Sequence, residues 1–241
     1  MHTTDRLRLV LASASPARRK LLQAAGIEPD VLISGVDESQ VDPSTPEALS
    51  RTLAQLKARA VAERIASAAK GAGATDEIGT NAAEPRTLVL GCDSVLAFDG
   101  EILGKPADAD EATRRWQAMR GKSGVLHTGH CLIDLSSGRE VARVAGTAVY
   151  FAEITDDEIA AYVATGEPLQ VAGAFTIDGL GGPFVDRVDG DPGAVIGLSL
   201  PLFRHMLGEL DLLITDLWAA RMTPFGAGAG TAATSAATDP H

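Results

Sequence analysis

The order of apolar and polar positions along the chain predicts short buried strands that alternate with amphipathic helices. Residues 7–12 form an apolar run between charged residues, which is typical of a buried strand. Ser15 and Pro16 follow it, and these residue types favour the N-cap and the first turn of a helix. Thr45 and Pro46 predict the start of a second helix in the same way, because leucines recur behind them at helical spacing.

The middle of the chain predicts antiparallel strand pairs joined by tight turns. An apolar run over residues 87–98 is followed by Asp99 and Gly100, a residue pair that favours a hairpin turn, and then by a short returning strand. A second strand pair is predicted over residues 125–135 and 140–152. Because hairpins alternate with helices, we expect an α/β fold in which helices flank a mixed β-sheet.

Two stretches lack hydrophobic periodicity and are rich in small residues. They cover residues 67–86 and residues 225–241. Such composition is typical of segments that pack poorly. We therefore expect one folded domain over residues 1–224 that carries a flexible insertion at about 67–86, followed by a disordered tail.

The charge balance excludes several classes of protein. The chain has 241 residues, and its 21 lysines and arginines against 32 aspartates and glutamates leave a net charge of −11. Sequence-independent binding to nucleic acid needs clustered cations, so we expect no nucleic-acid partner. No apolar run reaches the roughly 18 residues of a membrane helix, and the N-terminus lacks the pattern of a secretory signal. We expect a soluble, cytoplasmic protein with no membrane partner.

The first candidate site is the turn that leads into the first helix. It contains Ser13, Ser15, Arg18 and Arg19. Two cations near the positive end of a helix dipole are unfavourable by roughly 0.3–1 kcal/mol each when exposed, which suggests a nearby anion. Hydroxyls, free backbone amides and a guanidinium together can hold a phosphate group. The alternative is a capped helix whose arginines pair with acids elsewhere.

The second candidate is Asp93, the one acid inside the apolar run of residues 87–98. An ionised carboxylate in such a strand is costly unless it is paired or bound to a metal ion. The hairpin turn brings Lys105 back alongside, so Lys105 and Ser94 are its nearest possible partners in sequence. The alternative is a structural acid that accepts bonds from backbone amides at a strand end.

Two further charged residues have a chemical role only if the fold brings them to Asp93. Glu38 follows Asp37 in a loop, where adjacent acids are usually solvated, but carboxylates gathered at Asp93 could hold Mg²⁺ or Mn²⁺ against a phosphate chain. Lys57 falls within the apolar stripe of a predicted helix, so its ammonium needs a partner or an anion. A surface lysine is the plainer interpretation.

Two other patterns in the sequence argue against a P-loop nucleotide site and against a zinc site. The glycines at 179–182 do not have the spacing of a P-loop and lack its following lysine. His127 and His130 lie three residues apart in a predicted strand, which places them on opposite faces and disfavours a zinc pair.

Eight short motifs occur in order between Leu7 and Leu210. They read LASASPARRKLL, SGVDES, LAQLKA, LGCDSV, GKP, GEP, AGAFTIDGLGGPFV and VIGLSLPL. Together they resemble the Maf-like family, whose members are described as nucleoside triphosphate pyrophosphatases and are historically tied to inhibition of septum formation. The resemblance implies two lobes around a central cleft, in an architecture similar to inosine-triphosphate pyrophosphatase.

The resemblance also implies roles for particular residues. Asp93 matches the acid that serves the family as proton acceptor. The family's polar cleft residues are matched by Ser13, Arg18, Glu38, Lys57 and Lys105.

Four positions depart from the family's pattern. They are Ala17, which intervenes before Arg18; Ser94 in place of a frequent threonine; Gly124 in place of a common histidine; and Asp178, where members acting on dTTP and UTP often carry glutamine. The departure at Asp178 bears on base preference.

The resemblance further implies a hydrolase that splits a nucleoside triphosphate between the α and β phosphates, giving a nucleoside monophosphate and pyrophosphate. Catalytic roles are expected for Asp93, Lys57 and Lys105. Substrate binding is expected from Ser13, Ser15, Arg18, Arg19, Ser94 and Asp178. Glu38 and Asp93 are expected to hold a divalent metal ion, Mg²⁺ or Mn²⁺. We expect that ion to activate the water, because cations bound nearby would lower the pKa of Asp93 and make it a weaker base.

The resemblance implies dTTP or UTP as substrate and a homodimer as the assembly. The alternative substrate is 7-methyl-GTP or another modified nucleotide. Two other classes of protein stay open: a nucleotide-binding regulator of cell division with little turnover, and a phosphate-binding domain that uses only the turn before the first helix.

Overall fold

A seven-stranded mixed sheet organises the part of the chain that the computed structural model describes, residues 7–38, 41, 45–72 and 85–218. The order of the strands is β2-β1-β3-β5-β6-β7, and β4 pairs with β3 off this path. The strands are β1 (Leu7–Leu11), β2 (Asp30–Val31), β3 (Arg86–Phe98), β4 (Glu101–Leu103), β5 (Ser123–Asp134), β6 (Glu140–Phe151) and β7 (Val185–Asp189). β1 lies parallel to β2 and β3, and the other pairs are antiparallel, so the predicted mixed α/β sheet is confirmed.

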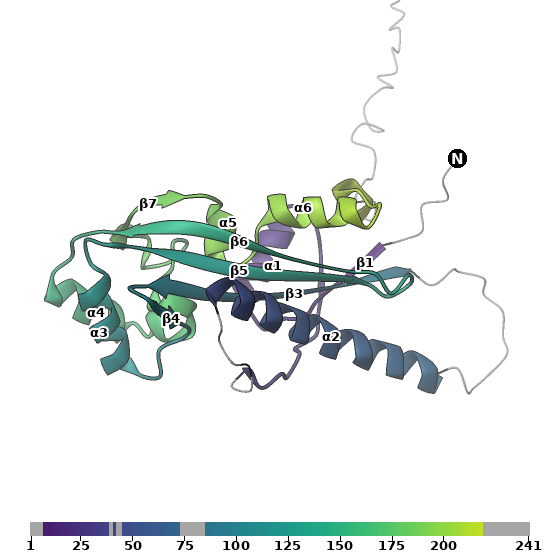
Figure 1. The fold of residues 1–241 in the computed structure, drawn as a ribbon, viewed down its shortest axis with the longest axis horizontal. Coiled ribbons are helices and arrows are strands. Elements are labelled where there is room, and N and C mark those ends of the chain that lie inside the picture. The colour runs from purple at the N-terminus through teal and green to yellow at the C-terminus, as the bar shows by residue number, and fades with distance from the viewer. Residues whose placement is uncertain (1–6, 39–40, 42–44, 73–84, 219–241) are drawn as a thin grey trace, which may run out of the picture.

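Helices cover both faces of the sheet. They are α1 (Pro16–Ala24), α2 (Pro46–Ala72), α3 (Ala109–Met119), α4 (Asp156–Ala164), α5 (Pro192–Ile196) and α6 (Leu200–Glu209). Figure 1 shows α2 along one face, α1, α5 and α6 on the other, and α3 with α4 beyond one end of the long strands. None of the helices in the described ranges is long and apolar enough to cross a membrane.

The local signals read from the sequence form the elements they predict. Ser15 Oγ accepts a hydrogen bond from the N–H of Arg18, and Pro16 is the first residue of α1. Thr45 Oγ1 accepts from the N–H of Ala48 at the start of α2. Each of these caps satisfies an N–H group that has no partner within its own helix.

The predicted insertion and tail can be compared with the structure only in part. The flexible insertion expected over residues 67–86 is wrong for residues 67–72, which continue α2 as helix to Ala72. Alanines in that segment favour a helix even without a regular apolar stripe, which is the pattern that the prediction relied on. Residues 73–84 and the expected tail at 225–241 lie outside the described residues.

The helix α2 packs directly against the backbone of the two central strands. A Cβ atom added to Gly91 on β3 would overlap the carbonyl oxygen of Ala54, and one added to Gly129 on β5 would overlap that of Ser50. Only glycine permits this close approach of helix and sheet. As a result, the first half of α2 lies close above β3, where it can deliver a side chain to the strand.

The sheet has an open segment along one edge of β3. Pairing with β1 ends at Leu90, and pairing with β4 begins at Leu96, so residues 91–95 have no strand partner on that side in the described part of the chain. On its other side β3 is paired with β5 throughout this segment. A buried strand with one exposed edge forms the floor of a hollow between the two helical layers.

Candidate active site

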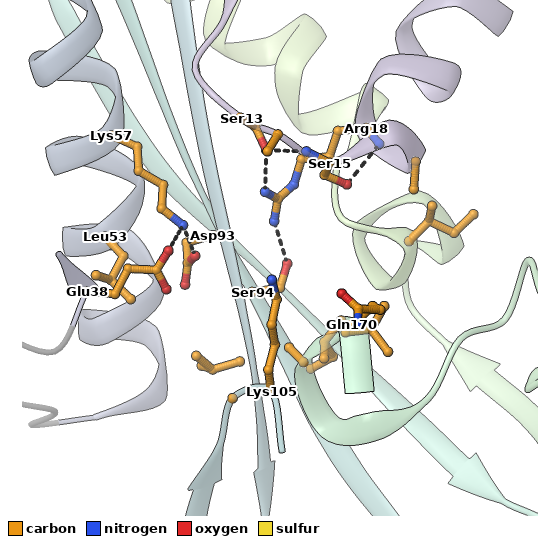
Figure 2. A pocket seen from close by; sticks show the side chains of 18 of the residues that line it. Ser13, Ser15, Arg18, Glu38, Leu53, Lys57, Asp93, Ser94, Lys105 and Gln170 are labelled. Carbon is orange, nitrogen blue, oxygen red and sulfur yellow. Dashed lines mark hydrogen bonds and ion pairs between the residues drawn. The ribbon is translucent and has the colours of Figure 1, made fainter. Parts of the chain in front are cut away.

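A cavity of about 870 Å³ lies against the open segment of β3. Residues of α1, α2, α5, β3, β4 and β5 and of the segments between them line it. They include nine residues that the sequence singled out: Ser13, Ser15, Arg18, Glu38, Lys57, Asp93, Ser94, Lys105 and Asp178. Apolar residues such as Leu49, Leu53, Ile102 and Phe175 form much of the remaining wall. The tertiary structure therefore gathers residues that are far apart in sequence into one hollow (Figure 2).

Asp93 and Ser94 both line the cavity although they are consecutive residues of one strand. Side chains of neighbouring strand residues leave opposite faces of a sheet. The side of Gly91 and Asp93 faces α2, and the side of Cys92 and Ser94 faces α1 and α6. Because the edge of β3 is open at this point, the cavity reaches around it and contacts both faces.

Asp93 lies in an ion pair with a lysine of α2. The Lys57 Nζ atom is 2.5 Å from Asp93 Oδ1 and 2.7 Å from Glu38 Oε1, so one ammonium bridges two carboxylates (Figure 2). Lys57 and Asp93 are buried, whereas Glu38 is half exposed. The prediction that Ser94 or Lys105 is the partner of Asp93 is therefore wrong. Lys57 takes that place because Gly91 lets α2 lie against the strand.

Burial changes the acidity of Asp93. It raises the pKa of this carboxyl above its ordinary value, and the positive charges of Lys57 and Arg18 offset only part of the effect. The negative charge of Glu38 acts in the same direction as burial. The neighbouring cations lower the pKa of Asp93 as expected, but desolvation of the charged form is the larger influence, so without a bound metal ion the net shift is upward.

Arg18 is held by uncharged acceptors. Its Nε atom donates to the carbonyl of Gly197 at 2.8 Å, one terminal nitrogen donates to Ser13 Oγ at 2.9 Å, and the other donates to Ser94 Oγ at 3.3 Å. No carboxylate pairs with it in the described part of the chain. The guanidinium is consequently fixed in place while its charge stays available for an anion in the cavity.

The hydroxyl groups of Ser13 and Ser15, before α1, act as hydrogen-bond acceptors within the described part of the chain. Ser13 Oγ accepts bonds from Arg18 and from the N–H of Ser15, and Ser15 Oγ accepts the capping bond. Among the contacts of the described residues, neither hydroxyl donates to a protein acceptor. Both can therefore donate to oxygen atoms of a bound anion at the N-terminus of α1.

Arg19 does not belong to the cavity, so its predicted role in substrate binding is corrected. Its side chain is half exposed and pairs with Glu28 at 3.0 Å. One step of a helix turns the next side chain by about 100°, which directs Arg19 away when Arg18 points inward. For Arg19, the alternative interpretation therefore applies: the arginine pairs with an acid elsewhere in the chain.

Lys105 and Asp178 lie at the exposed part of the cavity. Figure 2 shows the side chain of Lys105 extending from the segment after β4 toward Ser94. Asp178 belongs to the glycine-rich loop that follows Phe175. Lys105 adds positive charge on the side opposite Arg18, and Asp178 places a carboxylate at the rim.

The sequence marked Asp178 but did not identify the preceding residues 170–176 as a wall of the cavity. Gln170 and Thr176 line it together with apolar neighbours. Glu167 shapes this loop, because its carboxylate accepts bonds from Thr176 Oγ1 at 2.6 Å and from the N–H groups of Leu180 and Gly181 at 3.0 Å. The GEP motif, which contains Glu167, was a sign in the sequence that this segment has a role. These three donors lie 9 to 14 residues further along the chain than Glu167, and no local pattern identifies them.

The two histidines lie on different sides of β5. His130 is buried beside α6, where its Nε2 atom accepts from the N–H of Ser199 and its Nδ1 atom lies 3.0 Å from the carbonyl oxygen of Thr128. His127 faces α2, with Nδ1 at 3.6 Å from Glu47. Burial lowers the pKa of His130 to about 4, and the charge of Arg18 acts in the same direction. His130 is therefore a neutral structural group near the cavity.

The carboxylates of the cavity fit a metal ion that shares its ligands with a substrate. No group of three or more histidine, cysteine, aspartate or glutamate side chains within the described ranges could hold a metal alone. Glu38 and Asp93 do lie on either side of one ammonium, which shows that the two carboxylates can share a cation. Mg²⁺ is often held by one or two carboxylates together with phosphate oxygens and water.

The chain has clear similarity to known proteins. A family model described as Maf-like protein matches residues 8–210. A nucleoside triphosphate pyrophosphatase of Salinispora tropica is 61% identical over 95% of this chain and 94% of its own length. One of the same name from Streptomyces coelicolor is 57% identical over 91% of this chain and 98% of its own.

Among solved structures, a nucleoside-triphosphatase / dITP/XTP pyrophosphatase from Mycobacterium abscessus is 15% identical, with a TM-score of 0.33, over 85% of this chain and 97% of that chain. A TM-score this low does not show a shared fold. The expected likeness to inosine-triphosphate pyrophosphatase stays a prediction.

Proposed function

The chain belongs to the Maf family, and from that membership we propose that it is a nucleoside triphosphate pyrophosphatase, a hydrolase of acid anhydrides. The reaction proposed is hydrolysis between the α and β phosphates to a nucleoside monophosphate and pyrophosphate. One structural observation supports it above others. The cavity holds an unneutralised Arg18 on one side of the edge of β3 and the Lys57–Asp93 pair on the other.

The cations of the cavity provide the binding site for the phosphate chain. Arg18 offers a guanidinium without a carboxylate partner, and Ser13 and Ser15 offer hydroxyl protons beside it. Lys105 reaches in from the far wall. Negative charge spreads over the phosphate oxygens during phosphoryl transfer, and fixed cations stabilise that charge more than water does.

Glu38 and Asp93 would hold a divalent metal ion, Mg²⁺ or Mn²⁺, together with the phosphates. Such an ion supplies neutralisation of phosphate charge and a lower pKa for its bound water. Lys57 keeps the two carboxylates from repelling each other and fixes their orientation. A protein-only ligand set would be too small, so we expect the ion to bind tightly only with the nucleotide present.

Asp93 is the proposed proton acceptor for the attacking water. Burial raises its pKa in the site without a metal ion, whereas a divalent ion beside it would favour the ionised carboxylate and would lower the pKa of the water instead. Lys57 engages Asp93 Oδ1, which leaves Oδ2 to accept the proton. As the water oxygen bonds to phosphorus, the phosphoanhydride bond breaks, and the leaving pyrophosphate takes the electron pair beside the cationic groups.

The base preference is proposed as dTTP and UTP, with 7-methyl-GTP as the alternative. Asp178 is the observation that keeps the alternative open, because an ionised carboxylate only accepts hydrogen bonds. The donor edge of a guanine suits such an acceptor better than the mixed edge of uracil. A cytoplasmic location and a homodimer also remain proposals.

A screen for pyrophosphate release tests the function. The purified chain should release pyrophosphate from at least one standard or methylated nucleoside triphosphate, and chelation of divalent cations should abolish the release. Asp93→Asn should reduce turnover by about a thousandfold or more while nucleotide binding survives. Asp157→Asn, an exposed acid on α4, is the matched control and should leave turnover unchanged. Unaltered pyrophosphate release by Asp93→Asn would contradict the proposal.

A further inference from the structure

A chain of hydrogen bonds runs from Arg18 along one face of the sheet, over β3 and β5, to the backbone of α5. Arg18 donates to Ser94 Oγ at 3.3 Å, Ser94 Oγ and Thr128 Oγ1 lie 2.9 Å apart, and Thr128 Oγ1 donates to the carbonyl of Ala194 at 2.8 Å. Ser94 and Thr128 are directly paired residues of β3 and β5, so their side chains leave the same face of the sheet.

The last acceptor fixes the direction of every bond in this chain. A carbonyl oxygen only accepts, so the proton of Thr128 must go to Ala194. Thr128 Oγ1 therefore accepts from Ser94, whose single proton is committed to it. Ser94 Oγ in turn accepts from Arg18 and has no proton left to donate to a ligand. This distinguishes Ser94 from Ser13 and Ser15.

This chain of hydrogen bonds, called the relay below, is well buried at the end formed by Thr128 and Ala194. Thr128 and Ala194 are both completely buried, and a buried hydroxyl without its partners is costly. Thr128 does not line the cavity. Gly197, three residues after Ala194, accepts from Arg18 Nε, so the segment around α5 holds the guanidinium directly and also through the relay.

We propose that Thr128 is a positioning residue for the phosphate site: by donating to Ala194 it turns Ser94 into an acceptor that holds the Arg18 guanidinium toward the cavity. The proposal rests on the proposed function only for the identity of the anion. Its consequence is that a residue without contact to the substrate sets how well the phosphate chain is bound.

Removal of the Thr128 hydroxyl tests this role. Thr128→Val keeps the shape of the side chain and deletes the donor. We expect the Kd for pyrophosphate, measured by calorimetry, to rise about tenfold and kcat/KM for the nucleotide to fall about tenfold. Thr128→Ser retains a hydroxyl and should restore both values to within about twofold of the unmodified chain.

Thr147→Val is the matched control. Thr147 is a completely buried threonine of the neighbouring strand β6, and its hydroxyl bonds to the backbone of Asp191, just before α5. Both valine variants lose a buried hydroxyl near the same helix and should lower Tm similarly. Only Thr128→Val should weaken pyrophosphate binding, because only Thr128 connects to Ser94 and Arg18.

A double-mutant cycle separates positioning from general destabilisation. Because Thr128 acts through Ser94, Thr128→Val should add less than a twofold effect in a Ser94→Ala background. Independent, multiplying effects of the two changes, or equal Kd values for the Thr128 and Thr147 variants, would overturn the inference. Failure of the unmodified chain to release pyrophosphate would instead reject the proposed function, since the pyrophosphate-binding comparison does not need turnover.

Discussion

Lys57 and Asp93 form a buried ion pair, with the Nζ atom 2.5 Å from Oδ1, at the point where α2 lies closest to β3. Glu38 approaches the same ammonium from a loop at 2.7 Å. A buried carboxylate without its cation would be strongly destabilised. The pair therefore favours the ionised form of Asp93 and holds the two carboxylates that we propose as metal ligands beside one ammonium.

Replacement of Lys57 by methionine should move the pH dependence of the reaction. The positive charge of Lys57 lowers the pKa of Asp93, so its loss should raise that pKa further. If the ionised form of Asp93 is required, the acid limb of the kcat/KM profile moves to higher pH and the maximum falls about a hundredfold. Arg51→Met, an exposed cation on α2, is the control and should leave the profile in place.

The close approach of α2 to the sheet predicts a large difference between two glycine substitutions. Gly129→Ala places a Cβ against the carbonyl of Ser50 and should lower the free energy of unfolding by about 2 kcal/mol or more. Gly208→Ala in α6 meets no atom within 4 Å and should be neutral or stabilising by up to about 1 kcal/mol. Denaturant midpoints measure both. Equal midpoints would argue against backbone contact between α2 and β5.

His130 should make the folded state sensitive to acid. Burial lowers its pKa from 6.5 to about 4, so between these values the unfolded chain binds the proton more strongly. Stability from His130 is thus complete above pH 6.5 and is lost as the pH falls toward 4. Between pH 7 and pH 5 this amounts to about 2 kcal/mol.

Chemical denaturation at both pH values, compared with His130→Gln, isolates the effect of the imidazole. Glutamine has no titrating group but retains an oxygen that can accept from the N–H of Ser199. The difference in unfolding free energy between pH 7 and pH 5 should be smaller in the variant by about 2 kcal/mol. An unchanged difference would show that other groups cause the acid sensitivity.

Asp178 should influence which base is accepted. A glutamine at this position can donate as well as accept, which suits the adjacent donor and acceptor groups of uracil and thymine. Asp178→Gln should therefore raise the ratio of kcat/KM for UTP to that for 7-methyl-GTP by about tenfold. Asp186→Gln, an exposed acid on β7, is the control. An unaltered ratio would place the base away from Asp178.

Much of the fold could be predicted because its signals are local. The Ser15 cap and the Asp99–Gly100 turn depend on hydrogen bonds and backbone angles within a few residues, and both occur as expected. Residues 67–72 were assigned incorrectly because a helix of small residues lacks the apolar stripe that marked the others. The locations of chemically unusual residues, such as an acid within an apolar strand, were also readable in sequence.

The amino-acid sequence by itself determined the strands, helices and caps, and it marked Arg18, Lys57 and Asp93 as residues with unusual positions for their charge. Only the tertiary structure decided their partners. Arg18 faces the cavity while Arg19 faces away, and Lys57 rather than Lys105 pairs with Asp93. These contacts depend on how closely α2 packs and on where β3 lacks a neighbour. Such distances arise from packing between segments far apart in the chain, which no local pattern records.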